Sequence, residues 1–467
     1  MKRKDRKRMG LSDGPLWEAT RRATAAARRA GWKRPQIKRR LERVTANPEQ
    51  AVDDPIFGPL AQALVERREV RQAFAPRSEP APYRRWGTDD VDPQAVAQME
   101  NACRLPVAVA GALMPDAHLG YGLPIGGVLA TSKAVIPYAV GVDIACRMKM
   151  TVLDLPAGAI EGQRDRLVKA LEKETRFGIG ASFDKRRQHE VMDDPGWSTL
   201  PLTRRLKDKA WAQLGTSGSG NHFVEYGVLE IEDGGLELPP GRYLALLSHS
   251  GSRGAGATIA GHYSKLAMEL HPELPKELRH LAWLDLDSEP GQEYWQAMEL
   301  MGRYAAANHA CIHRHVVRAL GAKVLLEVEN HHNFAWREEH EGESLIVHRK
   351  GATPAGEGVL GIIPGSMASP AFLVRGKGET AALRSAAHGA GRRMSRKQAK
   401  QSFTWSETRK LLAERGVTLL SAGLDEVPMA YRDIEQVMAA QQDLVAPLAR
   451  FIPRIVKMAP AGERPED

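Results

Sequence analysis

The stretch VGVDIACRMKM, residues 140–150, places a carboxylate and a thiol three residues apart, just after a glycine. If this segment leaves a strand and turns, Asp143 and Cys146 can point into one cleft and share a divalent cation. A cysteine taken alone is more often a small buried hydrophobe. The stretch therefore predicts a metal site only if other parts of the chain supply further ligands.

Three histidine-bearing motifs supply such ligands. They are GTSGSGNHFVE at 215–225, SHSGSRG at 248–254 and NHHNF at 330–334. Histidines beside glycine and asparagine are poorly placed for a hydrophobic core, and the functional side chains of enzymes are commonly carried by loops on a rigid scaffold. These histidines are therefore expected on loops that face a ligand.

Charge divides the chain unevenly. Residues 1–86 hold 22 Lys and Arg against 10 Asp and Glu, whereas the remaining 381 residues hold 44 against 47. No Pro/Ser-rich linker follows residue 90. We therefore expect a basic extension over 1–88, largely helical or disordered, and one large domain over 89–467.

Within the extension, helical character is expected over 15–30 and 56–70, with a break at Gly31 and Pro35. Arginine outnumbers lysine by 17 to 5 before residue 87, and Trp17, Trp32 and Trp86 offer stacking surfaces. This composition suits an arm that binds phosphates. A solvated tail or a partner-docking tail is the alternative, and composition leaves both open.

Three cysteines, Cys103, Cys146 and Cys311, imply no disulfide framework and favour a reducing compartment. No apolar run approaches the roughly 18 residues of a membrane helix. The basic opening MKRKDRKRMG has no apolar stretch behind it. The sequence thus predicts a soluble, cytoplasmic protein.

From Leu105 onward, short apolar runs punctuated by glycine predict strands, with Asp116 and His118 on a loop between two of them. The fold class expected is α+β, with a mixed sheet and flanking helices. Helices are expected over 162–173, 203–213, 254–270 and 293–320, and strands over 242–247, 323–329, 345–348, 359–363 and 371–374.

Two further histidine patterns need separate interpretations. His309 and His313 stand at i and i+4 on the longest expected helix, a spacing that can bind zinc, but no glutamate follows His309. A pair satisfied by neighbours or lying at the surface is therefore preferred. His388 precedes Gly-Ala-Gly in SAAHGAGRRMSRKQAK, residues 385–400, where glycines and a following helix favour a bound anion.

These motifs together resemble the RtcB family of RNA-splicing ligases over roughly residues 90–458. The ordered set is MPDAHLGYGLPIGGV, VGVDIAC, GTSGSGNHF, HSGSRG, HHN, HRKGA, IPGSM and HGAGRRMSR. The resemblance implies an RtcB-like mixed α/β core and an RNA ligase in RNA repair or tRNA splicing. It implies a GTP- and manganese-dependent reaction that joins an RNA 3′-phosphate or 2′,3′-cyclic phosphate end to a 5′-hydroxyl end, with no membrane partner.

Site roles are carried over residue by residue from the same resemblance. Asp143, Cys146 and His222 would hold one Mn²⁺, and Cys146, His249 and His332 the other, with the thiolate as bridge. His388 matches the histidine that takes GMP from GTP, and Arg253, Lys350 and Arg392 are candidates for phosphate contacts. Nucleotide-contacting positions are matched by Asn221, His222, Phe223, Val224, Glu225, His332, Asn333, Pro364, Gly365, Ser366, Met367, Gly389, Ala390, Gly391 and Lys457.

The chain departs from the family pattern at a few positions. Ala145 and Arg147 stand where glycines usually flank the metal cysteine, Ala371 replaces a nucleotide-contacting serine, and MAPAGERPED follows Lys457. Two other functions use similar residues. A metal-dependent RNA-end phosphatase or hydrolase would not need His388, and a non-catalytic RNA-binding relative would tolerate loss of ligands. An activating protein partner and the oligomeric state stay open.

Overall fold

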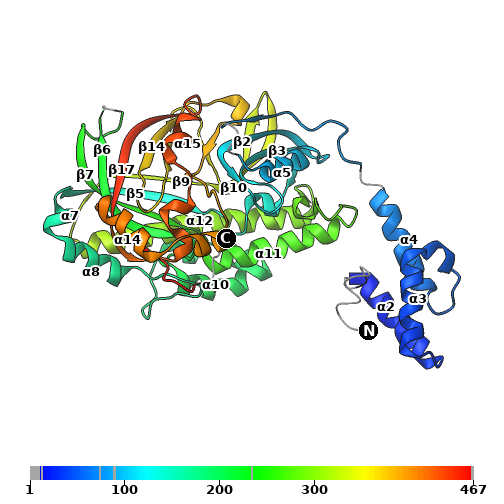
Figure 1. Ribbon diagram of the computed structural model, residues 1–467. Coiled ribbons are helices and arrows are strands. Elements are labelled where there is room, and N and C mark those ends of the chain that lie inside the picture. Colours follow the sequence, from blue (N-terminus) through cyan, green and yellow to red (C-terminus); the bar gives the residue numbers. More distant parts are fainter. Residues whose placement is uncertain (1–10, 12–13, 73–74, 88–90, 233–234, 464–467) are drawn as a thin grey trace. The chain divides into compact units, whose positions relative to one another are not determined.

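The computed structural model describes residues 11, 14–72, 75–87, 91–232 and 235–463 (Figure 1). The chain forms two compact units. One is Met1–Pro76 with Leu270–Glu277, and the other is Arg77–Glu269 with Leu278–Asp467. No helix of the described residues is both long and apolar enough to cross a membrane.

The N-terminal unit is helical in its described part, as expected. Helices α2 (Gly14–Arg29), α3 (Arg34–Ala46) and α4 (Gly58–Gln72) enclose a small apolar core that includes Leu16, Ile37 and Leu41. Gly31 breaks the chain with φ +83°, as predicted. The expectation for Pro35 was wrong, because Pro35 lies in the first turn of α3, where its missing N–H costs no helical hydrogen bond.

The larger unit is built on a curled sheet in the order β13-β14-β17-β6-β7-β5-β9, with β16 paired to β17. Its two edges are bridged by Asn330, whose amide donates to Ile362 O (3.4 Å) and whose Oδ1 accepts from Ile362 N (2.8 Å). The strands are β5 (Arg147–Pro156), β6 (Phe223–Ile231), β7 (Gly241–Ser250), β9 (Val324–His331), β13 (Leu360–Ile363), β14 (Ala371–Gly376), β16 (Thr418–Ser421) and β17 (Val445–Met458).

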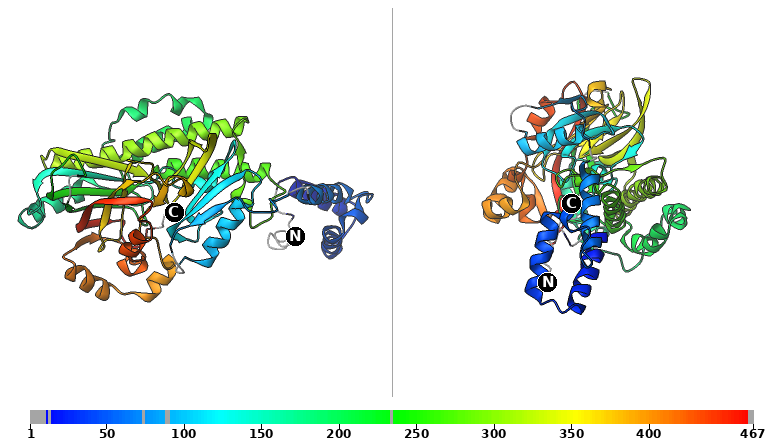
Figure 2. Two further views of the ribbon diagram at one scale, coloured as in Figure 1. Left: turned by 90° about the horizontal axis from the view of Figure 1, so that it is seen from above. Right: turned by 90° about the vertical axis from the view of Figure 1, so that its right-hand side faces the viewer.

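Two apolar clusters fix the two faces of this sheet. Met148, Met150 and Leu247 belong to the cluster formed within the curl. On the other face, Leu246 packs with residues of α8 (Arg164–Glu174) and of the 31-residue α12 (Glu289–Ala319), such as Ile312. Figure 2 shows α12 running along the sheet. This long helix therefore supports the strands that carry the histidine motifs.

A second sheet, β1-β2-β3-β11-β10, completes the unit. Its strands are β1 (Tyr83–Arg85), β2 (Ala108–His118), β3 (Ile125–Thr131), β10 (Asn333–His340) and β11 (Glu343–Lys350). Asp116 and His118 therefore lie in the last part of a strand, and their predicted placement on a loop was wrong. Trp86 was expected as a stacking surface, but its side chain is 4% exposed and donates to Asp443 Oδ2 (2.9 Å).

Most of the expected helices and strands are confirmed with shifts at their ends. The helix expected over 162–173 is interrupted, because α7 ends at Gly162 and α8 starts at Arg164. Strands β6, β10 and β17 were not predicted. The other elements are α5 (Pro93–Cys103), α6 (Pro137–Val140), α7 (Ala159–Gly162), α9 (Gly196–Thr199), α10 (Pro201–Gln213), α11 (Arg253–Leu270), α13 (Arg396–Ser402), α14 (Trp405–Glu414), α15 (Ile434–Ala439), β4 (Ala134–Val135), β8 (Leu284–Asp285), β12 (Ala352–Pro354) and β15 (Ser385–Ala387).

Candidate functional site

A pocket of about 1220 Å³ in the larger unit collects most of the predicted site residues. Its wall contains side chains from both sheets and from the loops between them. The predicted residues that line it are Asp143, Cys146, Asn221, His222, Phe223, Glu225, His249, His332, Asn333, Pro364, Gly365, Ser366, Met367, His388, Gly389, Ala390 and Gly391. Val224 and Lys457 do not line it.

The turn that carries Asp143 and Cys146 lies between α6 and β5. The expectation that this stretch leaves a strand was wrong, because it enters one. Gly141 and Ala145 have φ of +105° and +58°, which reverse the chain here. Ala145 N donates to Asn333 O (2.7 Å) and His332 N donates to Cys146 O (3.0 Å). The turn is thus pinned to the segment that holds a third predicted ligand.

Antiparallel pairing explains why ligands so distant in sequence meet. Cys146 precedes β5, His222 precedes β6, His249 lies near the end of β7 and His332 follows β9. The register pairs His249 with Phe223 on one side and with Met148 on the other. Because neighbouring strands run in opposite directions, the starts of β5 and β6 lie beside the ends of β7 and β9. All four side chains therefore gather at this end of the strands.

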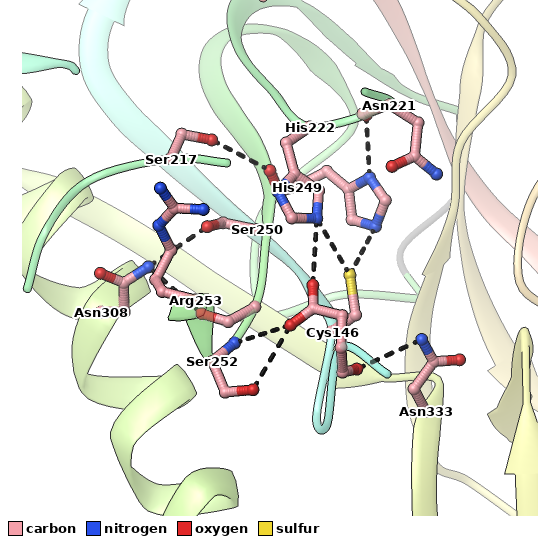
Figure 3. Close-up of polar contacts among 12 residues, drawn as sticks. Cys146, Ser217, Asn221, His222, His249, Ser250, Ser252, Arg253, Asn308 and Asn333 are labelled. Carbon is pink, nitrogen blue, oxygen red and sulfur yellow. Dashed lines mark hydrogen bonds and ion pairs between the residues drawn. The ribbon is translucent and has the colours of Figure 1, made fainter. Parts of the chain in front are cut away.

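The candidate ligand atoms lie within contact distance of one another, and Figure 3 shows this for Cys146, His222 and His249. Cys146 Sγ lies 3.1 Å from His249 Nε2 and 3.5 Å from His222 Nε2. His222 Nε2 lies 3.2 Å from Asp143 Oδ2, and His249 Nε2 lies 3.2 Å from His332 Nε2. Two groups of three ligands result, Asp143/Cys146/His222 and Cys146/His249/His332, and both contain Cys146.

The hydrogen bonds around these ligands fit cation binding. His249 Nδ1 lies 3.0 Å from Asn221 O, so Nδ1 carries the hydrogen and Nε2 presents a lone pair to the pocket. That lone pair faces His332 Nε2 and Cys146 Sγ. Nitrogen and sulfur atoms of this kind are good ligands for one shared metal ion. The residues present therefore fit two divalent cations with the thiol common to both.

Burial sets the charge state of this cluster. It lowers the pKa of His249 to about 3, helped by the neighbouring His222, and lowers that of His332 well below its usual value. Although burial alone would raise the pKa of Asp143, its hydrogen bond with His222 lowers it. Neutral imidazoles beside an ionised carboxylate are the forms that bind metals.

The loop after β7 holds the Asp143 carboxylate. Ser252 N donates to Asp143 Oδ1 (3.0 Å). A Cβ atom on Gly251 would lie only 2.2 Å from Asp143 Oδ2, so glycine is required for this close approach. The HSGSRG motif therefore contributes both a ligand, His249, and the cradle of another.

His388 stands across from the metal-ligand cluster, and its partner is Asp116. Asp116 is fully buried, and its Oδ2 lies 2.7 Å from His388 Nδ1 and accepts from His388 N and Gly389 N (both 3.2 Å). The rings of His388 and His332 are 5.1 Å apart. If the Nδ1 hydrogen points to Asp116, Nε2 of His388 keeps a lone pair, and this is the form in which an imidazole can act as a nucleophile or a base. Sequence reasoning noted Asp116 but did not assign this role.

The pair on α12 differs, as predicted. Ser248 Oγ lies 2.7 Å from both His309 Nδ1 and His313 Nε2, and Thr151 Oγ1 lies 2.7 Å from His313 Nδ1. Neither histidine is in a group of potential metal ligands among the described residues. The interpretation as a pair satisfied by neighbours is confirmed for both nitrogens of His313 and for Nδ1 of His309, whereas Nε2 of His309 has no hydrogen-bond partner among the described residues.

The alternation of side chains along a strand explains why Val224 and Lys457, which were predicted to contact the nucleotide, do not line the pocket. Phe223 and Glu225 of β6 face the pocket, whereas Val224 between them belongs to the apolar cluster beneath. Likewise Val456 and Met458 of β17 line the pocket, and Lys457 Nζ donates to Leu171 O (3.3 Å). The side chains of Val224 and Lys457 therefore lie on the face of the sheet that packs against α8.

The three candidate phosphate-binding cations have different surroundings. Arg253 is buried and donates to Thr216 Oγ1 (3.0 Å) and Gly178 O (2.8 Å), so it holds the fold together. Arg392 lines the pocket but donates to Asp425 O (2.8 Å). Lys350 also lines it, and burial lowers its pKa to about 7. Lys350 Nζ donates to Tyr121 O (2.6 Å), so each of the three cations has a partner within the fold, and only Lys350 and Arg392 line the pocket.

The departures from the family pattern have structural explanations. Ala145 occupies a left-handed conformation that favours glycine. The Arg147 guanidinium leaves the pocket and donates to Glu329 Oε1 (3.1 Å) and Gly302 O (3.2 Å). Ala371 lines the pocket with 3% exposure, and its replacement of serine has no further structural explanation.

Comparison with known proteins agrees with this geometry. The family model described as tRNA-splicing ligase RtcB matches residues 98–198 and 196–458. The RNA-splicing ligase RtcB of Escherichia coli K12 is 34% identical, over 79% of this chain and 95% of its own. The tRNA-splicing ligase RtcB of Nanoarchaeum equitans is 32% identical, over 77% and 90%. The RNA-splicing ligase RtcB of Mycobacterium tuberculosis H37Rv is 30% identical, over 76% and 98%. On these grounds the chain belongs to the RtcB family of RNA-splicing ligases.

Proposed function

We propose that this protein is an RNA ligase of RNA repair or tRNA splicing that joins RNA 3′-phosphate or 2′,3′-cyclic phosphate ends to 5′-hydroxyl ends. In this proposal it uses GTP and two Mn²⁺ ions and forms a covalent histidine–GMP intermediate at His388. The carrying observation is the 2.7 Å contact between Asp116 Oδ2 and His388 Nδ1 beside the paired metal-ligand groups.

The proposed first step uses His388 as nucleophile. Its Nε2 lone pair attacks the α-phosphorus of GTP, a nitrogen–phosphorus bond forms, and the bond to the β-phosphate oxygen breaks with release of pyrophosphate. Asp116 keeps the imidazole in the required tautomer and stabilises the positive charge that develops on the ring. An oxygen of the RNA 3′-phosphate then attacks the phosphorus of this adduct, and the nitrogen–phosphorus bond breaks and frees His388. The 5′-hydroxyl oxygen attacks the 3′-phosphate phosphorus and displaces GMP as the new phosphodiester forms. A 2′,3′-cyclic phosphate end is first opened by water to the 3′-phosphate.

The metal sites would be held by Asp143, Cys146 and His222 and by Cys146, His249 and His332. When bound, a pair of divalent cations neutralises charge on the phosphoryl oxygens of an in-line displacement. Thiolate and imidazole also suit other divalent metals, so the choice of manganese follows the family resemblance. The pocket wall at Phe223, Asn333 and 364–367 would hold the guanine nucleotide.

The two alternative functions receive no support from the relatives, whose names are those of ligases. A phosphatase or hydrolase would use the same cations to activate water and would not need His388 beside a glycine-rich, anion-binding loop. A non-catalytic relative would not need its ligands, and all five are gathered in the pocket. We therefore propose ligation alone.

The test is covalent labelling by α-³²P-GTP with Mn²⁺, followed by a denaturing gel. The wild-type chain should carry the label, and His388→Ala should carry none, because the nucleophile is removed rather than weakened. His262→Ala is the matched control, since His262 is an exposed histidine of α11 outside the pocket lining. A labelled His388→Ala variant, or an unlabelled wild-type protein, would overturn the proposal.

A further inference from the structure

The described cations of α2 and α3 are concentrated on the outside of the N-terminal unit. Between residues 14 and 46 there are ten Lys and Arg and two Glu, a net charge of +8. Nine of the ten cations are exposed, and Arg40 is half-buried beside Asp54. Such a density on two helices joined by residues 30–33 (Figure 2) repels itself, and a polyanion would relieve that repulsion.

Few of these charges are neutralised within the unit. Apart from the pair of Arg40 with Asp54, the ion pairs in these helices are Arg22–Glu18 at 3.7 Å and Lys38–Glu42 at 3.9 Å, both between exposed side chains. Ion pairs between exposed side chains contribute little to stability, so they hold these cations only weakly. Among the described residues, Arg21, Arg28, Arg29, Arg34, Arg39 and Arg43 have no acidic partner.

Three of the cations surround one groove between α2 and α3, here called the basic groove. It has a volume of about 250 Å³, and its lining includes Arg28, Arg34 and Lys38 around the buried Ile37 and Leu41. Arg21 stands seven residues before Arg28 and therefore on the same face of α2. The basic groove is thus a row of guanidinium and ammonium groups on an apolar floor, a shape that suits successive phosphates.

We infer that the basic groove binds the phosphodiester backbone of RNA outside the catalytic pocket, without reading its sequence. This inference rests on the proposed function, which supplies RNA as the polyanion. An anionic membrane is the less suitable occupant, because interfacial helices insert a free apolar face. Within the described part of α2 and α3 no large apolar side chain is exposed, and the apolar faces form the core of the unit.

The test compares three full-length proteins. One is wild type, one carries Arg28→Gln, Arg34→Gln and Lys38→Gln, and the control carries Lys169→Gln, Arg205→Gln and Lys265→Gln. The control removes three exposed cations from α8, α10 and α11, outside the pocket lining. Thermal unfolding of each protein checks that the exposed substitutions leave the fold intact.

The measurement is the affinity for a labelled single-stranded RNA with a 3′-phosphate, by fluorescence anisotropy across a salt series. Each cation that no longer neutralises a phosphate lowers the slope of log affinity against log salt by ~0.7, so the groove variant should show a slope shallower by about 2 and bind about 10- to 100-fold more weakly near 0.1 M salt. The control should keep the wild-type slope. Equal slopes for the groove variant and wild type would overturn the inference.

Two further measurements distinguish a failure of the inference about the basic groove from a failure of the proposed ligase function. Labelling of His388 by GTP should be unchanged in the groove variant, because the labelled site lies in the other unit. If wild type binds RNA with the expected slope but takes no label, the ligase proposal fails and the groove stands. Binding of wild type to phosphatidylserine vesicles that the groove substitutions abolish, with RNA affinity unchanged, would assign the groove to lipid instead.

Discussion

The protein buries two sets of histidines on either side of β7, and they differ in what surrounds their nitrogens. His309 and His313 of α12 meet hydroxyl groups, so each contact pairs a donor with an acceptor. His222, His249 and His332 instead meet one another, a thiol and a carboxylate. Burial lowers the pKa of His249, His332, His309 and His313 alike. Burial and a lowered pKa are therefore common to both sets of histidines, and the sets differ in the chemical groups that lie next to their nitrogens.

Among substitutions that test this difference between the two sets of histidines, we expect the largest effect at Cys146. Because its sulfur belongs to both ligand groups, Cys146→Ala should reduce bound metal from about two ions per chain to none, whereas Asp143→Ala should chiefly weaken one. Metal content is measured by mass spectrometry after dialysis. Two ions retained by the cysteine variant would show that the sulfur is not a bridge.

Asp116 tests the orientation of the nucleophile without touching the metal ligands. Asp116→Asn should lower the rate of His388 labelling by GTP by about 100-fold or more, since the imidazole loses its fixed tautomer. Metal content should stay at the wild-type value. Loss of metal together with the rate would mean that Asp116 maintains the whole pocket rather than the ring of His388.

Removal of the α12 pair should change stability rather than metal binding. His313→Leu removes one of the two buried partners of Ser248 Oγ and one of the two partners of Thr151 Oγ1, and should lower the free energy of unfolding by about 1–3 kcal/mol. Urea unfolding gives the free energy, and the dialysed variant should still hold its metal. A variant that keeps its stability but loses an ion would place His313 with the ligands.

The smallest effect concerns the turn before β5. Ala145→Gly should raise the free energy of unfolding by up to about 1 kcal/mol, because glycine adopts φ near +58° without the penalty of a Cβ atom. Val142→Gly is a control in the same turn, where φ is not positive and glycine should destabilise. A destabilised Ala145→Gly protein would contradict the left-handed conformation.

The candidate ligands could be predicted from residue types and spacing in the sequence. Roles that depend on contacts between distant parts of the chain could not. The spacing of Asp143 and Cys146 and the glycine-rich surroundings of the histidines marked them as candidate ligands, and the family resemblance supplied the two groups of three. The role of Asp116 could not be predicted, because its partner lies 272 residues away and only the folded chain brings them together. Val224 is a different case. The alternation in FVEYGVLEI contains the signal that Phe223 and Glu225 share one face and Val224 the other, once 223–231 is known to be a strand.

The separation of these partners along the chain has a consequence for synthesis. Cys146 meets residues 76 and 103 positions later, and Asp116 waits for His388. Such long-range contacts form slowly and only after the intervening chain has been ordered. At roughly 5–20 residues per second, a ribosome needs on the order of tens of seconds to add the last of them. In the proposed mechanism, a nascent chain that ends before residue 388 lacks the nucleophile, so ligation would begin only after the ribosome has passed this position.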